Sequence, residues 1–133
     1  MSTVKQITTK RPKSIGHKTS IASAAKAMRQ ARVGSLLVKK GKQFIGVVTD
    51  TDIVRRAVAT GKPLGKLTVE KIMTSPICTI EGSQSVDDAQ DMMADLGVRH
   101  LGSPRTARLQ GWYLSVTSYR SISAMPSRRF QRR

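Results

Sequence analysis

The stretch from Gly46 to Asp52 carries the residue types best suited to chemistry. Its apolar part is expected to be a strand that ends at Thr49, with a helix beginning within the next three residues. Free backbone N–H groups and the positive end of the helix dipole would then lie beside a hydroxyl and a carboxylate. Thr49 can donate to a phosphate oxygen, and Asp52 can accept from both hydroxyls of a ribose. Because Gly46 has no side chain, a flat base or sugar can approach the strand there, so the pattern is suited to a nucleotide.

A purely structural interpretation of the same residues is available. Thr and Asp are preferred at helix N-caps in any protein, so Thr49, Asp50 and Asp52 taken alone are more often a cap than a binding site. Whether these residues form a cap or a binding site depends on the helices and strands that position them.

The first half of the chain predicts five elements around this stretch. Thr19 and Ser20 can open a helix whose apolar positions lie three and four residues apart. Lys40 and Gly41 provide a turn between two short apolar strands, and Gly61 ends a second helix. The expected order is strand, helix, strand, strand, helix, at residues 14–15, 21–28, 35–38, 44–48 and 53–58.

The chain also repeats itself. Met28 recurs as Met93, 65 positions later, and Thr3-Val4 recurs as Thr68-Val69 at the same spacing. A repeat of this kind indicates two equivalent units rather than one irregular domain.

The second copy keeps the local pattern of the first. Ser85 and Asp88 make a Ser-x-x-Asp helix start before a run with helical periodicity. We therefore predict an α/β (α+β) fold of two tandem β-α-β-β-α units, at residues 1–66 and 67–133. Each unit is too small to bury its own apolar faces, so the two are expected to pack as a pseudo-symmetric pair.

Within this repeat the sequence resembles a CBS domain, the small module named after cystathionine β-synthase. The resemblance covers about residues 3–101. It implies a tandem pair, often called a Bateman module, which binds adenine nucleotides or S-adenosylmethionine in clefts between its halves and usually dimerises. The matching segments are 12–15, 21–28, 33–38 and 46–53 in the first copy, and 69–74, 79–80 and 85–101 in the second.

The resemblance nominates a ligand site. The glycine, hydroxyl and aspartate motif of the family falls on Gly46, Thr49 and Asp52. The implied ligand is AMP, ATP or S-adenosylmethionine, and the implied function is a non-catalytic sensor that requires no cofactor and forms a homodimer. The segment that enters the first strand also usually contacts the ligand in this family, which nominates Lys13, Ser14 and Ile15. At the start of the next strand, Val33, Gly34 and Ser35 are secondary candidates for a base pocket.

After Leu101 the chain departs from the family pattern. The nearest counterpart of the motif, Gly111 to Ser118, has serine where aspartate is expected, and serine cannot accept two ribose hydroxyls as a carboxylate does. We therefore predict one competent site per chain. Trp112, Tyr113 and Leu114 are still expected to form the strand that the second half needs. The departure also prompts the hypothesis that this tail is read in a shifted frame, which sequencing the gene across these codons would test.

Charge is the unusual feature of the composition. The 24 Lys and Arg against 8 Asp and Glu give a formal charge of +16, and residues 102–133 hold seven Arg but no acid. Such a balance favours polyanionic partners. A basic nucleic-acid-binding protein is thus one alternative function, although the aromatic residues are not interleaved with the basic ones. A structural adaptor with an empty cleft is another.

Other classes have little support. Cys78 is the single cysteine, which excludes an internal disulfide, and no apolar run approaches the roughly 18 residues of a membrane span. A soluble cytoplasmic protein without a membrane partner is therefore expected. His17, His100 and Cys78 lack metal-ligand spacing, and no acid pair suggests acid–base catalysis, so neither a metal nor an enzyme is predicted.

Overall fold

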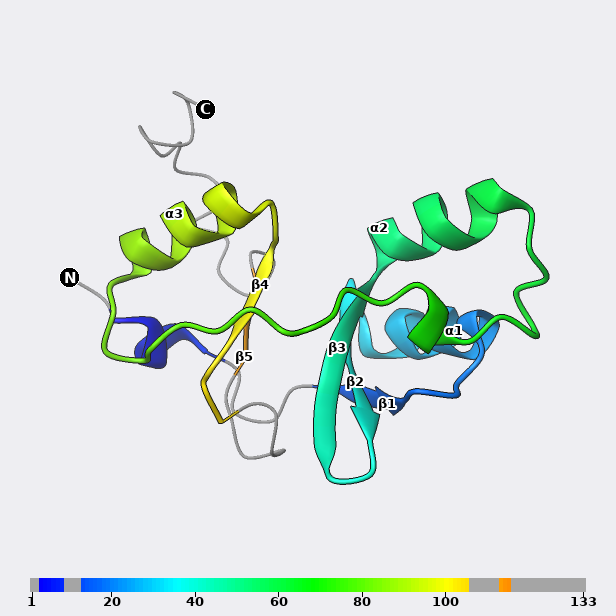
Figure 1. Ribbon diagram of the computed structural model, residues 1–133, viewed down its shortest axis with the longest axis horizontal. Helices are drawn as coiled ribbons and strands as arrows, with labels where there is room; N and C mark the ends of the chain where they lie inside the picture. The colour runs from blue at the N-terminus through cyan, green and yellow to red at the C-terminus, as the bar shows by residue number, and fades with distance from the viewer. Residues whose placement is uncertain (1–2, 9–12, 106–112, 116–133) are drawn as a thin grey trace. The chain divides into compact units, whose positions relative to one another are not determined.

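A computed structural model describes residues 3–8, 13–105 and 113–115 of the chain (Figure 1). The chain divides into two compact units, one of Pro12–Ile77 and the other of Met1–Arg11 with Cys78–Arg133. These contact-based units are offset from the predicted repeats at 1–66 and 67–133. The repeat boundaries stay a prediction about the sequence, and the offset has a structural cause near the N-terminus.

That cause is the packing of Val4. The short 3-10 helix Val4–Ile7 lies against the second unit, where the Val4 N–H donates to the Gln84 carbonyl over 2.8 Å. Val4 is fully buried in an apolar cluster with Ile80, Met93 and other residues of that unit. The first residues of the chain therefore complete the second core rather than the first.

The first unit has the predicted order of strand, helix, strand, strand and helix (Figure 1). Its sheet has the strand order β1-β2-β3, with β1 parallel to β2 and β2 antiparallel to β3. A mixed α/β fold is thereby confirmed. The elements are β1 (Ser14–Gly16), α1 (Ile21–Ala31), β2 (Ser35–Lys40), β3 (Gln43–Thr49) and α2 (Asp50–Asp52), which continues as a π-helix (Ile53–Ala57) and a 3-10 turn (Val58–Thr60).

Local chemistry sets the ends of α1. The Ser20 side chain accepts a hydrogen bond from the Ser23 N–H, and Arg32 ends the helix in the left-handed conformation at φ 55°. One apolar face of α1 then covers the sheet, because its buried positions follow helical spacing. The core beneath it consists of Ile21, Ala24, Met28, Leu36, Val38, Val48, Ile53, Ala57, Val69 and Ile72.

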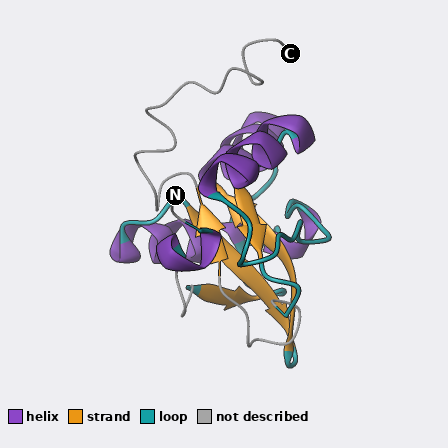
Figure 2. Cartoon of the chain, turned by 90° about the vertical axis from the view of Figure 1, so that its left-hand side faces the viewer, coloured by secondary structure: helices purple, strands orange, loops and turns teal. Residues whose placement is uncertain are grey.

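The second unit repeats part of this arrangement. Helix α3 (Val86–Leu96) leads to β4 (His100–Gly102), which pairs antiparallel with β5 (Tyr113–Ser115). Thr79 forms a parallel bridge with Gly102, as β1 does with β2 in the first unit. Figure 2 shows these helices and strands by colour.

The predicted strand at Trp112–Leu114 is confirmed where the structure describes it. Tyr113 and Leu114 belong to β5, whereas Trp112 lies outside the described residues. Of the motif counterpart from Gly111 to Ser118, only Tyr113, Leu114 and Ser115 lie within the described residues. Among the described helices, none is long and apolar enough to cross a membrane, and the location in the cytoplasm stays a prediction.

Candidate functional site

The first unit brings three strand ends to one end of its sheet. Ser35 at the start of β2 pairs with Thr49 at the end of β3, and Ser14 of β1 pairs with Leu37. Side chains alternate between the faces of a strand, and Leu36 belongs to the core beneath α1. Ser14, Ser35 and Thr49 therefore share the opposite face. Residues that are far apart in the sequence thus lie close together at the end of β3, beside Thr49.

Thr49 and Asp52 form a reciprocal capping box. The Asp52 N–H donates to Thr49 Oγ1 over 3.0 Å, and the Thr49 N–H donates to Asp52 Oδ2 over 3.1 Å. Thr49 and Asp52 therefore cap a helix, as the structural interpretation of these residues predicts. A hydroxyl has one donor and two acceptor positions, so the Thr49 O–H is not consumed by accepting this bond. The cap fixes the side chain and leaves its proton to donate.

Asp52 has a second neighbour on its other oxygen. Arg56 Nε lies 3.7 Å from Asp52 Oδ1, and Arg56 Nη1 donates to the Ile72 carbonyl over 3.2 Å. Only 9% of Asp52 is exposed. A carboxylate offers about four acceptor positions, so the capping bond and the ion pair leave acceptor capacity on Asp52. Arg56 is therefore the side chain next to the oxygen of Asp52 that does not take part in the capping bond.

Gly46 lies against the chain rather than in open space. A Cβ at Gly46 would be 2.7 Å from Met73 Sδ and 2.8 Å from the Thr74 carbonyl oxygen. Thr74 is there because it pairs with Val47 of β3 through two backbone hydrogen bonds of 2.8 and 3.0 Å. Glycine is required at this position by that close approach. Its predicted contact with a base or sugar stays a prediction.

The residues at the start of β1 differ in how far their side chains are buried. Lys13 is exposed, and its carbonyl accepts the Leu37 N–H over 3.0 Å. Ile15 is half-buried and packs against the core beneath α1. The Ile15 side chain is therefore occupied by packing, whereas Lys13 and Ser14 leave polar groups at the surface.

Val33 and Gly34 line a separate groove on the helix side of the first unit. The groove has a volume of about 430 Å³. Asp50 closes one side of it, since its N–H donates to the Gly34 carbonyl over 2.9 Å. Neither Thr49 nor Asp52 lines this groove. The full lining is Ala25, Met28, Arg29, Arg32, Val33, Gly34, Asp50, Ile53 and Val54.

The nominated residues therefore divide between two surfaces. The sequence offers Asp50 only as a helix cap, and it predicts neither the place of Asp50 in the groove nor the pairing of Thr74 with Val47, because both depend on residues distant in the chain. The only available signal was the glycine itself, since glycine inside a strand often marks a close backbone approach.

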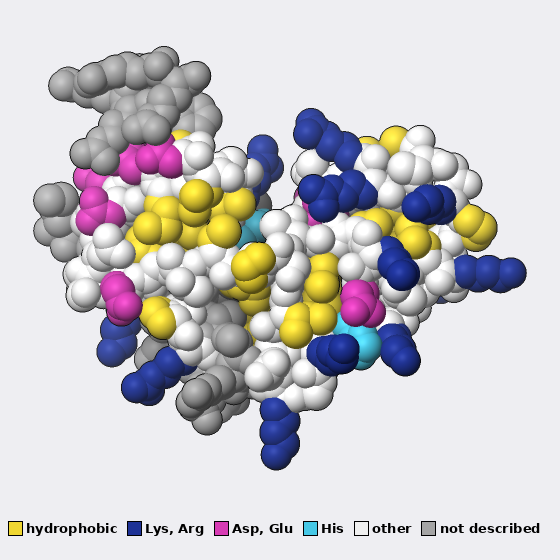
Figure 3. Space-filling view, viewed as in Figure 1, with side chains coloured by type: hydrophobic (Ala, Val, Ile, Leu, Met, Phe, Trp, Pro, Cys, Tyr) yellow, Lys and Arg dark blue, Asp and Glu magenta, His cyan; other side chains and the backbone are white. Residues whose placement is uncertain are grey.

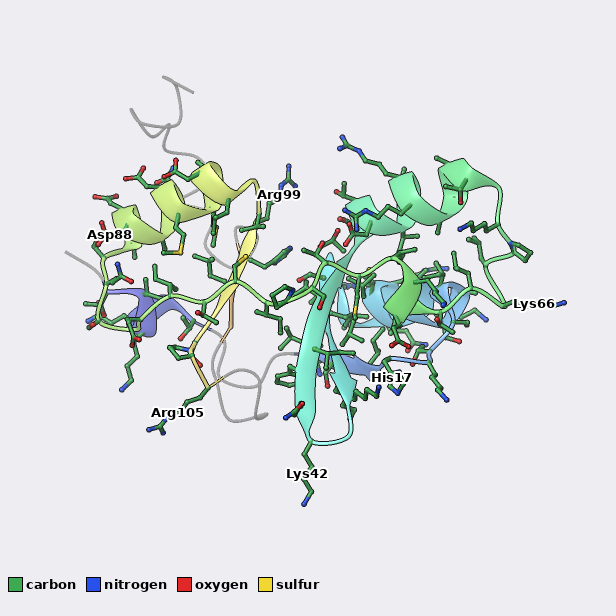
Figure 4. All side chains as sticks on the ribbon, in the orientation of Figure 1. His17, Lys42, Lys66, Asp88, Arg99 and Arg105 are labelled. Carbon is green, nitrogen blue, oxygen red and sulfur yellow. The ribbon has the colours of Figure 1, made fainter. Side chains whose placement is uncertain are left out.

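A polar pair ties the segment after the first unit's last helix to the loop after β1. His17, which is labelled in Figure 4, follows β1. Its Nδ1 lies 3.0 Å from Glu70 Oε2, and the Glu70 N–H donates to the His17 carbonyl over 3.2 Å. The hydrogen bond from His17 is the main cause that lowers the pKa of the Glu70 carboxyl, and Lys40 and Lys71 lower it further. Among the described residues, no group of three His, Cys, Asp or Glu side chains is placed to hold a metal ion.

Comparisons with known proteins point to one family. A profile of the CBS domain matches residues 4–59. The chain is 31% identical over 101 residues to the CBS domain-containing protein YhcV of Bacillus subtilis, covering 76% of this chain and 71% of that protein. It is 33% identical over 75 residues to an uncharacterized protein of Methanopyrus kandleri, covering 56% of this chain but 38% of that protein.

Solved structures have the same fold. A protein with CBS domains from Burkholderia ambifaria has a TM-score of 0.81 at 28% identity and covers 92% of this chain and 95% of its own. A CBS domain protein from Pyrobaculum aerophilum, complexed with AMP, has a TM-score of 0.73 at 24% identity, with 92% and 96% covered. The CBS domain pair of protein MJ0100, in complex with 5-methylthioadenosine and S-adenosylmethionine, has a TM-score of 0.74 at 22% identity, with 92% and 99% covered. The fold is that of a tandem CBS pair.

Proposed function

This chain belongs to the CBS-domain family, and on that premise we propose that it is a non-catalytic regulatory module that binds an adenosine-type ligand. AMP, ATP and S-adenosylmethionine are the candidates. The proposal is supported by two structural neighbours that hold AMP or S-adenosylmethionine and by the chemistry of this chain's own motif. The module acts as a homodimer whose packing responds to the ligand.

One observation carries the assignment of the site. Thr49 and Asp52 lie together at the end of the sheet where β1 and β2 begin, with a donor on one and acceptor capacity on the other. Thr49 donates to a phosphate or carboxylate oxygen of the ligand, and Asp52 accepts from the ribose hydroxyls. Lys13 and Ser14 at the entry to β1 supply charge and a further hydroxyl.

The remaining nominated residues contact the adenine base of the ligand or set the shape of the site. Ser35 lies opposite Thr49 on β2, next to Val33 and Gly34. Ile15 and Gly46 act by backbone and packing, since the side chain of the first is in the core and the second has none. The proposed ligand site thus consists of Lys13, Ser14, Ile15, Ser35, Gly46, Thr49 and Asp52, whereas Val33 and Gly34 line the separate groove on the helix side.

Isothermal titration of the purified chain with AMP, ATP and S-adenosylmethionine tests this function. We expect one of the three to bind, and Asp52→Ala to weaken binding about ten- to a hundredfold, because hydrogen bonds to a charged group are lost. Asp88→Ala is the matched control, since Asp88 closes an equivalent capping box with Ser85 at α3. Equal affinity of Asp52→Ala and the wild type would show that the ribose assignment is wrong.

The two alternative functions have their own readouts. A nucleic-acid-binding protein would bind any duplex with an affinity that falls steeply with salt. A structural adaptor would bind none of the three ligands while still associating with itself. Binding of an adenosine-type ligand with loss in Asp52→Ala separates the proposed function from both.

A further inference from the structure

The β2–β3 hairpin extends beyond the rest of the first unit's sheet. Strand β1 pairs with β2 from Leu37 to Lys39, and on the other side of the hairpin Thr74 pairs with Val47. Among the residues that the structure describes, no strand pairs with the outer edges of residues 40–44. Figure 1 shows the hairpin as a two-stranded ribbon that projects from the sheet. The end of this ribbon is therefore accessible to a partner.

A tight turn keeps the tip of the ribbon narrow. Lys40 pairs with Gln43, so Gly41 and Lys42 form a two-residue turn, and Gly41 has a φ of 62°. A glycine with positive φ at the first turn position is typical of the type II′ hairpin. The tip lies about two residues beyond the level of Lys39, which corresponds to about 7 Å.

Lysines gather at this tip and in the loops behind it. Lys39, Lys40 and Lys42 are exposed on the hairpin. Lys18 is exposed in the loop after β1, and that loop is hydrogen-bonded to the Lys39 carbonyl. Figure 3 shows Lys and Arg side chains projecting from this end of the first unit. Since residues 1–49 contain no Asp or Glu, the hairpin and its neighbouring loop carry positive charge alone.

Glu70 is an acidic residue near the base of the hairpin. The pKa of its carboxyl is lowered first by the hydrogen bond from His17 and then by Lys40 and Lys71, so both lysines lie near this carboxylate. His17 Nδ1 is already its partner at 3.0 Å. One paired carboxylate does not neutralise the lysines of the hairpin and the loops, so this end of the unit attracts negative charge.

The shape and charge of the hairpin fit duplex DNA. The major groove of B-form DNA is about 12 Å wide and about 8.5 Å deep, and it admits a two-stranded β-ribbon. A ribbon that projects by about 7 Å reaches into this groove, and lysines at its tip then face the phosphates along the groove. The major groove of an RNA duplex is too narrow for such an element. DNA is therefore the polyanion that matches both properties.

We infer that the tip of the β2–β3 hairpin enters the major groove of duplex DNA and contacts the phosphates through its three lysines. Lys18 and Lys71 add charge from the loops beside it. Lysine ammonium groups are point charges on flexible stems, so these contacts do not select a sequence. The tip lies at the opposite end of β3 from Thr49, so DNA and an adenosine-type ligand can bind the same chain. The inference does not rest on the proposed nucleotide site.

Neutralising the hairpin lysines tests this surface. One variant carries Lys39→Gln, Lys40→Gln and Lys42→Gln, and fluorescence anisotropy with a labelled DNA duplex measures its affinity at several salt concentrations. The logarithm of the association constant falls with the logarithm of the salt concentration, by about 0.9 for each phosphate contact. We expect the magnitude of this slope to fall by about 2 to 3, because three contacts are lost.

A matched variant removes the same number of charges elsewhere. Lys26→Gln, Lys62→Gln and Lys66→Gln alter three exposed lysines outside the hairpin and the loops beside it. Figure 4 shows Lys42 and Lys66 pointing in different directions. The matched variant should keep the slope of the wild type. An equal reduction in both variants, or an unchanged slope in the hairpin variant, would overturn the inference, and circular dichroism checks that both variants are folded.

Lysine acetylation of the wild-type chain locates the contact without any substitution. Residues 102–133 contain no lysine, so this readout does not register the arginines of that segment. We expect mass spectrometry to show several-fold less acetylation of the hairpin lysines when DNA is bound, with Lys26, Lys62 and Lys66 unchanged. Protection of these three lysines in place of the hairpin would contradict the inference.

Other polyanions distinguish shape from charge. The same acetylation experiment is repeated with an RNA duplex of the same sequence and with poly-glutamate, and DNA should protect the hairpin at lower concentration than either. Equal protection by RNA or poly-glutamate would mean that charge alone is recognised and would overturn the assignment to DNA, as would a wild type that does not bind DNA. Titration of the hairpin variant with AMP is a separate readout and should match the wild type, so failure of the DNA surface does not count against the nucleotide site.

Discussion

The two units contain the same capping box in two different settings. Asp52 donates its N–H to Thr49 Oγ1 and Asp88 donates its N–H to Ser85 Oγ, each over 3.0 Å. Asp52 is buried in the short helix α2 that follows the end of β3 and lies beside Arg56, whereas Asp88 is exposed at the start of α3. The motif is therefore a helix start in both units. Its position at the end of the sheet distinguishes the first one as a candidate site.

Gly46 lies in the strand that leads to the capping box of Thr49 and Asp52. Gly46→Val should destabilise the chain by about 3 kcal/mol, because the side chain would overlap Met73 and the Thr74 carbonyl. Urea unfolding measures the change. Gly65→Ala is the matched control, since nothing lies within 4 Å of a Cβ there and it should cost little. Similar stability of the two variants would show that Thr74 does not approach β3.

The two boxes themselves should differ in stability less strongly. Asp52→Ala should cost about 2 kcal/mol, because it removes a cap and leaves Arg56 without its carboxylate. Asp88→Ala should cost about 0.5 kcal/mol, as expected for an exposed cap. Denaturant midpoints of both variants measure these changes. Equal losses would mean that burial of Asp52 contributes nothing.

The sequence predicted those parts of the molecule that depend on neighbouring residues. The element order of the first unit follows from apolar spacing and from turn residues such as Gly41 and Gly61. The contact between Thr49 and Asp52 follows from a spacing of three residues. The strand at Tyr113 and Leu114 follows from an apolar run, although the surrounding sequence departs from the family.

Contacts between distant residues were not predictable in the same way. Thr74 pairs with Val47, and Val4 packs in the core of the second unit, without any local pattern that indicates either partner. The groove needs the end of α1 and the start of α2 to meet, which depends on how α1 packs on the sheet. Tertiary packing therefore decided which nominated residues share a surface.

Ionisation of Glu70 should make a weak, pH-dependent contribution to the stability of the fold. Because the folded-state pKa of Glu70 is lowered, this carboxyl stabilises the fold above its unfolded-state pKa, and the stabilisation is lost as pH falls through the folded-state pKa. Glu70→Gln should therefore be less stable than the wild type at neutral pH and equal to it in acid. Urea midpoints across this range measure the difference. A constant difference at all pH values would contradict the role of ionised Glu70.

A crystal structure of the chain with AMP would show directly whether Thr49 and Asp52 bind the nucleotide. We expect both ribose hydroxyls within hydrogen-bond distance of the Asp52 carboxylate and a phosphate oxygen accepting from the Thr49 hydroxyl, with no ligand at Asp88. A nucleotide bound elsewhere, or one whose ribose does not reach Asp52, would contradict it.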